Sequence, residues 1–285
     1  GHTTANSSPT GGSGRYTYTS SNTAIATVDP ATGVITAVST GTATITVTDA
    51  SYNNITTTQT ANVYVPLSVQ NSSGTTITTA TAKAGVAVTF KAPDTAGSGS
   101  FTWSVTGPAT ATLTPSTDTK SVTFTAPTTG TFAGAYTLEL KDNLSGFTTT
   151  IKVNVPMLLD PSTSTFRSDA GVQTFKTSGA AVGSTFAWTM VVSTCDPTNP
   201  TTCTAIPDAD KPKYGTPGGS TSDTETFTPA AVTQTMNFKW QIVTNDPALI
   251  AAGLQTLYSD MIRIVPVANY VVTITDSNGS AINGT

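Results

Sequence analysis

Short runs of alternating apolar and polar residues recur along the whole chain, and Gly, Pro, Asn or Asp residues separate them. In residues 42–48, for example, Ala43, Ile45 and Val47 fall on one face of an extended chain. Alternation with a period of two predicts half-buried β-strands. The chain is also rich in Thr and Val, which fit a pleated surface. We therefore expect an all-β protein.

Two sequence markers repeat along the chain and predict a row of similar units. The first is a pair of aromatic residues separated by one position, repeated in steps of 85 residues at Tyr16/Tyr18, Phe101/Trp103 and Phe186/Trp188. The second is a strand-like segment that ends in Val-Pro, at Pro66, Pro156 and Pro266. A chain of 285 residues suits about three sandwiches of roughly 100 residues each. We expect units at 1–66, 67–156 and 157–266, joined at the prolines with little linker.

The unit at 157–266 is the longest, and two insertions account for its length. One is the turn-rich segment that contains Cys195 and Cys203. The other is DPALIAAGLQTLY, which predicts a short helix because Asp246 can cap its start and Pro247 suits its first turn. This helix is expected to present four apolar residues on one face, namely Leu249, Ile250, Leu254 and Leu257.

Residues 16–48 resemble a known family. Their sequence, YTYTSSNTAIATVDPATGVITAVSTGTATITVT, is similar to the bacterial immunoglobulin-like domain of group 2, which occurs in tandem in invasin- and intimin-type surface proteins. The resemblance implies an immunoglobulin-like β-sandwich that serves as a spacer or an adhesive tip, and it implies no shared catalytic residues. The other two units share only the order of their predicted strands with residues 16–48. Extending the resemblance to them predicts three immunoglobulin-like sandwiches in a row.

Three aromatic residues of the repeated pairs are expected in the sandwich cores. Trp103 and Trp188 fall where immunoglobulin-like sandwiches bury a tryptophan, and Tyr18 belongs to the corresponding pair of the first unit. A sugar-stacking platform is the alternative for these side chains. The positions repeat between units, which binding aromatics need not do, and this favours the core.

Cys195 and Cys203 flank a proline-rich turn segment, and we expect a disulfide that closes a surface loop. A disulfide indicates an oxidising compartment and therefore an extracellular protein. A pair of free thiols is the alternative. The two cysteines and the distant His2 supply too few ligands for a zinc site.

Composition argues against several other functions. Charged residues make up 10% of the chain and the net charge is −4, whereas a nucleic-acid partner needs a basic face. No apolar stretch is long enough to insert into a membrane. His2 is the only histidine and the acidic residues are scattered, so we expect no enzyme activity and no cofactor. Calcium near Asp49, Asp142 and Asp160 is conceivable, but these residues are better explained as turn formers.

The two ends of the chain fit the missing front of one unit. The unit at 1–66 lacks a first strand, and the tail at 267–285 carries a strand pattern without a sandwich. The assembly residues of this tail are Tyr270, Val272, Ile274 and Ile282. We expect the tail to complete the unit at 1–66 of a second copy by strand donation. The copies are separate chains or successive repeats of one polypeptide, and a sequence cut inside a domain is the alternative.

These observations predict a non-enzymatic structural subunit of a cell-surface fibre whose partner is itself, head to tail. Two alternatives stay open. In one, the protein is an adhesin whose unit at 157–266 binds a glycan or a surface receptor. In the other, it is an accessory module of a secreted polysaccharide-degrading enzyme.

Overall fold

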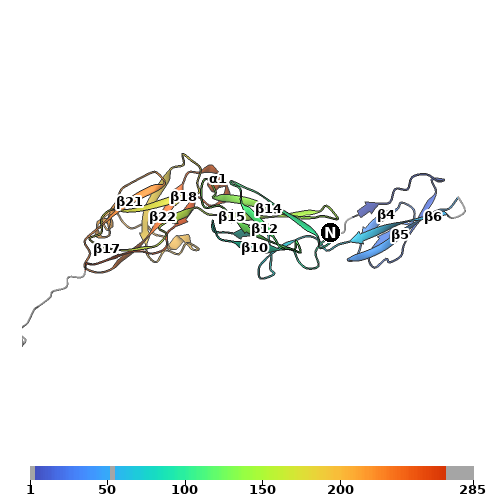
Figure 1. Cartoon of the computed structure of the whole chain (residues 1–285), viewed down its shortest axis with the longest axis horizontal. Coiled ribbons are helices and arrows are strands. Elements are labelled where there is room, and N and C mark those ends of the chain that lie inside the picture. Colours follow the sequence, from blue (N-terminus) through green and yellow to red (C-terminus); the bar gives the residue numbers. More distant parts are fainter. Residues whose placement is uncertain (1–3, 52–54, 268–285) are drawn as a thin grey trace, which may run out of the picture.

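The computed structural model describes residues 4–51 and 55–267, and nearly all of its regular structure is β-strand. The described strands form six sheets, and each sheet takes its strands from one part of the chain. The sheets fall into three pairs, which we call the first, second and third sandwich and which follow one another along the long axis (Figure 1). The all-β fold class expected from the alternation is confirmed.

The first sandwich pairs a sheet of order β1-β4-β3 with a sheet of order β2-β5-β6. Its strands are β1 (Thr4–Asn6), β2 (Tyr16–Ser20), β3 (Ala26–Val28), β4 (Val34–Ala37), β5 (Gly41–Asp49) and β6 (Ile55–Val63). The alternation of β5 places Ala43, Ile45 and Val47 inside, as the sequence indicates. The buried cluster between the sheets is small and consists of Ala26, Ile35, Ala43 and Ile45.

The second sandwich contains more strands than the first. One sheet has the order β12-β13-β10-β7-β8, and the other has the order β11-β14-β15-β9. The strands are β7 (Val69–Asn71), β8 (Thr76–Ile77), β9 (Thr79–Thr81), β10 (Val88–Lys91), β11 (Phe101–Thr106), β12 (Thr112–Pro115), β13 (Ser121–Thr125), β14 (Gly134–Asp142) and β15 (Thr148–Val155).

The third sandwich repeats this plan with insertions. Its sheets have the orders β16-β18-β21-β20 and β17-β24-β22-β19, and β23 also pairs with β22. The strands are β16 (Leu158–Asp160), β17 (Ser164–Arg167), β18 (Gln173–Ser178), β19 (Phe186–Val192), β20 (Gly215–Pro217), β21 (Thr224–Pro229), β22 (Met236–Thr244), β23 (Thr256–Tyr258) and β24 (Ile262–Val265). The helices are two short 3-10 turns, η1 (Pro200–Thr202) and η2 (Lys211–Lys213), and one α-helix, α1 (Pro247–Ala252).

The helix α1 begins where the sequence predicts but is shorter than predicted. The Asp246 carboxylate accepts the N–H groups of Ala248 and Leu249, which caps the first turn. Gly253 adopts a φ of 72° and ends the helix. The predicted four-residue apolar face is therefore wrong: Leu249 is fully buried and Ile250 is 51% exposed, while Leu254 follows the helix and Leu257 belongs to β23.

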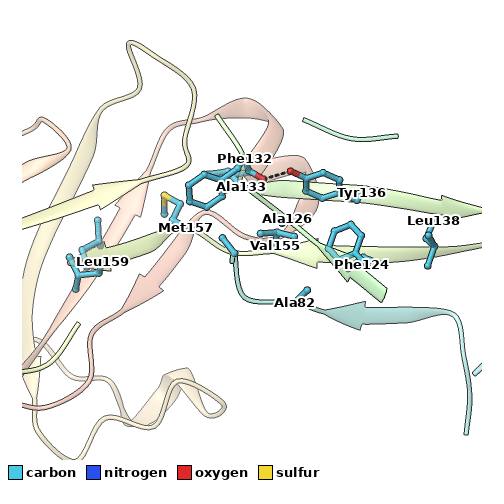
Figure 2. Close-up of a cluster of buried hydrophobic side chains, with 14 of the residues drawn as sticks. Ala82, Phe124, Ala126, Phe132, Ala133, Tyr136, Leu138, Val155, Met157 and Leu159 are labelled. Atoms are coloured by element: carbon cyan, nitrogen blue, oxygen red, sulfur yellow. Dashed lines mark hydrogen bonds between the residues drawn. The ribbon is translucent and has the colours of Figure 1, made fainter. Parts of the chain in front are cut away.

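The second and third sandwiches share one hydrophobic core, whereas the first sandwich has its own. Met157 and Phe132 are both buried in this shared core (Figure 2), and the Phe132 ring lies against Gly179 of the third sandwich. Leu249 is buried in the same cluster, and the Ala133 N–H donates to the Gly179 carbonyl at 3.0 Å. The boundary expected at Pro156 therefore lies inside a continuous core.

Candidate functional site

In the second and third sandwiches, the opening segment supplies one strand to each sheet. In the second sandwich, β7 pairs antiparallel with β10 and β9 pairs parallel with β15. In the third, β16 pairs antiparallel with β18 and β17 pairs parallel with β24. Both sandwiches are thus covered along the side where their two sheets would otherwise lie open.

The first sandwich lacks both of these strands within its described residues. Its strand β1 pairs with β4 as β10 pairs with β13. Asn6 lies ten positions before Tyr16, just as Lys91 lies ten positions before Phe101. By this correspondence β1 takes the place of β10. Among the described strands, none pairs with the outer edge of β1 or of β6.

An open groove of about 900 Å³ lies along part of this uncovered side. Apolar side chains from both sheets line it, including Ala5, Ile35, Ala37, Ala61 and Val63. Ala5 is exposed, whereas Phe90, which occupies the corresponding place in β10, is 1% exposed. On the first sandwich the groove exposes positions between the two sheets, and it continues to the start of the second sandwich, where Leu67, Gly97 and Phe147 also line it.

The outer edge of β6 has none of the usual protection against pairing. Its sequence ITTTQTANV contains no charged residue and no proline, and most of its side chains are exposed. Ile55, at its start, is 64% exposed. Natural sheets protect free edges with charges, prolines or a covering segment because an unprotected edge recruits another strand. The composition of β6 thus suits a strand that has a partner.

The first and second sandwiches each contain a loop aspartate that accepts N–H groups from two loops, an arrangement that we call the carboxylate clamp. In the first sandwich it lies at the end away from the groove. The Ser13 N–H donates to Oδ2 of Asp49 at 2.7 Å, and the Ser98 N–H donates to Oδ2 of Asp142. The N–H groups of Ser51 and Leu144, two residues after each aspartate, donate to the Oδ1 atoms. Each aspartate therefore ties two loops together, which is the turn-forming role preferred over calcium binding.

Burial alone raises the pKa of the Asp142 carboxyl, but the hydrogen bonds from Ser145 and Ser98 outweigh it and lower the pKa to about 2. Asp160, the third residue considered for calcium, lies at the end of β16 on the surface. No group of three or more His, Cys, Asp or Glu side chains suited to a metal ion occurs in the described part of the chain.

The three core aromatics differ in their burial. Tyr18 is 6% exposed and Trp103 is 7% exposed, and the Trp103 indole N–H donates to the Thr119 carbonyl at 2.9 Å. Trp188 is only partly buried and packs at the edge of the core. The fully buried tryptophan of the third sandwich is Trp240 on β22, with its ring edge-on to Trp188 at a centroid distance of 5.8 Å.

A disulfide joins Cys195 to Cys203 and closes an exposed loop of the third sandwich. The residues between them that face solvent include Asp196, Pro197 and Pro200. The Lys239 ammonium donates to the Cys195 carbonyl at 2.6 Å, which anchors the loop to β22. The disulfide and this hydrogen bond thus tie the loop to β22.

Four assembly residues and the lone histidine lie outside the described residues. The assembly residues are Tyr270, Val272, Ile274 and Ile282, and the histidine is His2. Across residues 4–51 and 55–267, no helix combines the length and the hydrophobicity needed to cross a bilayer.

Residues 2–51 match the family model described as the immunoglobulin-like domain of intimin. This segment contains β1 to β5 and most of the clamp around Asp49. The predicted resemblance to intimin-type immunoglobulin-like domains is therefore confirmed for this part of the chain. No curated protein matches the chain in sequence.

Several solved structures resemble the chain at low identity. An endo-fucoidan hydrolase from glycoside hydrolase family 107 is 14% identical over 95% of this chain with a TM-score of 0.24, and this chain spans 39% of its length. An I-band fragment from titin is 9% identical, with coverages of 94% and 93% and a TM-score of 0.25. Drosophila N-cadherin is 10% identical, with coverages of 91% and 69% and a TM-score of 0.24.

Proposed function

We propose that the chain is a non-enzymatic structural subunit of an extracellular surface fibre, joined head to tail. In this arrangement the tail at 267–285 of one copy completes the first sandwich of the next copy. The observation that carries the proposal is the uncovered groove between β1 and β6, because two strand positions filled in both other sandwiches are unfilled there among the described residues.

A sequence match between the tail and the opening strands of the second sandwich supports this assignment. Residues 272–282 read VTITDSNGSAI and residues 67–77 read LSVQNSSGTTI. The corresponding positions hold an apolar residue, a second apolar residue, an Asx residue, a glycine and an isoleucine. These pairs are Val272 with Leu67, Ile274 with Val69, Asp276 with Asn71, Gly279 with Gly74, and Ile282 with Ile77.

The turn in the second sandwich explains why the Asx and glycine positions matter. Oδ1 of Asn71 accepts the N–H groups of Ser73 and Thr75 at 3.1 and 3.0 Å, and Gly74 adopts a φ of 82°. Asp276 has the same acceptor oxygen and Gly279 the same conformational freedom. The tail can therefore form a turn equivalent to the one that links β7 to β8 in the second sandwich.

The register of the donated strand follows from the second sandwich. There Asn71 lies opposite Phe90, and Ala5 takes the place of Phe90 in the first sandwich, so Asp276 would lie opposite Ala5. Ile274 would then occupy the place of Val69, which is 1% exposed. Burying Ile274 would stabilise the contact by about 1.5–3 kcal/mol, and Ile282 would add less because its counterpart Ile77 is only partly buried.

The proposed location and the absence of enzyme activity rest on separate observations. The disulfide between Cys195 and Cys203 is typical of oxidising compartments, and the match of residues 2–51 is to a domain of intimin. The two carboxylate clusters considered for metal binding, at Asp49 and Asp142, are hydrogen-bonded to loop N–H groups, and the uncovered groove favours the fibre as the function.

A pair of single substitutions in the tail tests the proposal. Ile274→Asp places a carboxylate in the proposed core, whereas Thr273→Asp places the same charge one position away, on the opposite face of the strand. We expect Ile274→Asp to weaken head-to-tail association at least about 100-fold and Thr273→Asp to leave it within about threefold. Light scattering against concentration measures both. Equal association by the two variants would refute strand donation.

A further inference from the structure

The tip of the first sandwich, at the opposite end from the groove beside Val63, has the features of a second docking site. We propose that this tip, around Gly12 and Asp49, receives residues 270–272 of the neighbouring copy in the way that the tip of the second sandwich receives residues 65–67. The inference rests on the proposed strand donation and adds a separate contact to it.

The junction between the first and second sandwiches shows how such a tip holds an incoming segment. Val65 forms a parallel bridge with Ala96, and the Gly97 N–H donates to the Val65 carbonyl at 3.1 Å. The Leu67 side chain packs over Gly97, with Cδ2 3.0 Å from the point where a Cβ would lie. A glycine is needed because any side chain there would meet Leu67 and the Asp142 carboxylate.

The tip of the first sandwich repeats this arrangement position by position. Gly12 adopts a φ of 76° against Asp49, as Gly97 adopts 49° against Asp142, and each glycine would place a Cβ against the carboxylate beside it. The loop hydrogen bonds also correspond. The Ala50 N–H donates to Arg15 at 3.1 Å, and the Asn143 N–H donates to Ser100 at 2.9 Å.

The site around Gly12 is open where the site around Gly97 is filled. A groove of about 460 Å³ runs between residues 9–12 and the start of β6. The exposed side chain of Ile55 lies at its wall. No acceptor for the Gly12 N–H is found among the described residues, whereas the Gly97 N–H is bonded to the segment that enters the second sandwich.

The sequence match identifies the segment that fits this tip. Because Val272 corresponds to Leu67, residues 270–272 correspond to residues 65–67. The Gly12 N–H would then donate to the Tyr270 carbonyl, and the Val272 side chain would cover Gly12. In the proposed register, residues 270–272 lie at the tip and Asp276 lies opposite Ala5 in the large groove. A single extended segment can therefore occupy both sites.

Amide hydrogen exchange on the wild-type 285-residue chain tests this site, comparing dilute protein with protein assembled at high concentration. The Ser7 N–H donates to Gly33 on the β4 side, so by alternation the Asn6 N–H points outward and reports on strand donation. The Gly12 N–H reports on the tip. Two glycines of the same chain serve as references: Gly97, already bonded, and Gly14, with no other atom within 4 Å of its Cβ position.

We expect assembly to slow exchange at Asn6 and at Gly12 by at least tenfold, with Gly14 unchanged and Gly97 protected throughout. Slowing at Asn6 without slowing at Gly12 would overturn the tip site and leave strand donation standing. Slowing at neither position, or no assembly at all, would overturn both.

Discussion

The buried carboxylate of Asp142 predicts a specific dependence of stability on charge and pH. Its pKa is about 2 in the folded protein, against an ordinary value of 3.8. At about 1.4 kcal/mol per pKa unit, the ionised form contributes about 2 kcal/mol to folding. Because the folded-state pKa is lowered, this contribution is present above pH 3.8 and is lost as the pH falls through 2.

Asp142→Asn removes this contribution and creates a second cost. The amide nitrogen that replaces Oδ2 would face the Ser98 N–H, leaving a donor without an acceptor at a cost of about 1–3 kcal/mol. We expect a total loss of about 3–5 kcal/mol at pH 7. Part of the deficit relative to wild type, about 2 kcal/mol, should disappear at pH 2.

Urea unfolding followed by tryptophan fluorescence at pH 7 and pH 2 measures this difference. Asp94→Asn is the matched control because the Asp94 side chain is 93% exposed and lies 3.7 Å from Lys120. Its effect should stay below about 1 kcal/mol at either pH. A deficit of Asp142→Asn that is equal at both pH values would refute the role assigned to the charge.

Three further outcomes follow from the packing. Trp240→Ala and Trp103→Ala should each cost about 3–5 kcal/mol in chemical unfolding, because both rings are buried; a cost below 1 kcal/mol would place either ring outside the core. Met157→Asp should split the common melting of the second and third sandwiches into two calorimetric transitions, and a single transition would contradict their shared core. Without reductant, alkylation should label neither Cys195 nor Cys203, and replacing both by serine should cost at most about 2–3 kcal/mol.

Local sequence pattern was sufficient for much of the fold. Alternation located β5 and its buried face because a strand that is half buried repeats with a period of two. Asp246 and Pro247 located the start of α1 because capping depends on a few neighbouring residues. The repeated aromatic pairs led to Tyr18 and Trp103, which are both buried.

Features that depend on contacts between distant segments could not be predicted from local sequence pattern. Trp240 is fully buried in the third sandwich. Its strand β22 also pairs with β23, which lies in the insertion that we expected to be helical. The merged core of the second and third sandwiches brings together residues from both sides of Pro156, among them Phe132 and Met157. For the candidate site, the sequence predicted the tail residues and an uncovered edge in the unit at 1–66, whereas the residues that line the groove and the tip around Gly12 required the structure.

A circular permutant provides the most direct test of strand donation. Moving residues 267–285 in front of Gly1 through a short flexible linker lets the tail fill the groove of its own chain. Sedimentation velocity should then show a monomer at concentrations where the unpermuted chain forms multimers, and the permutant should melt at a higher temperature than the dilute unpermuted chain. A permutant that assembles as readily as the original chain would contradict head-to-tail completion of the first sandwich.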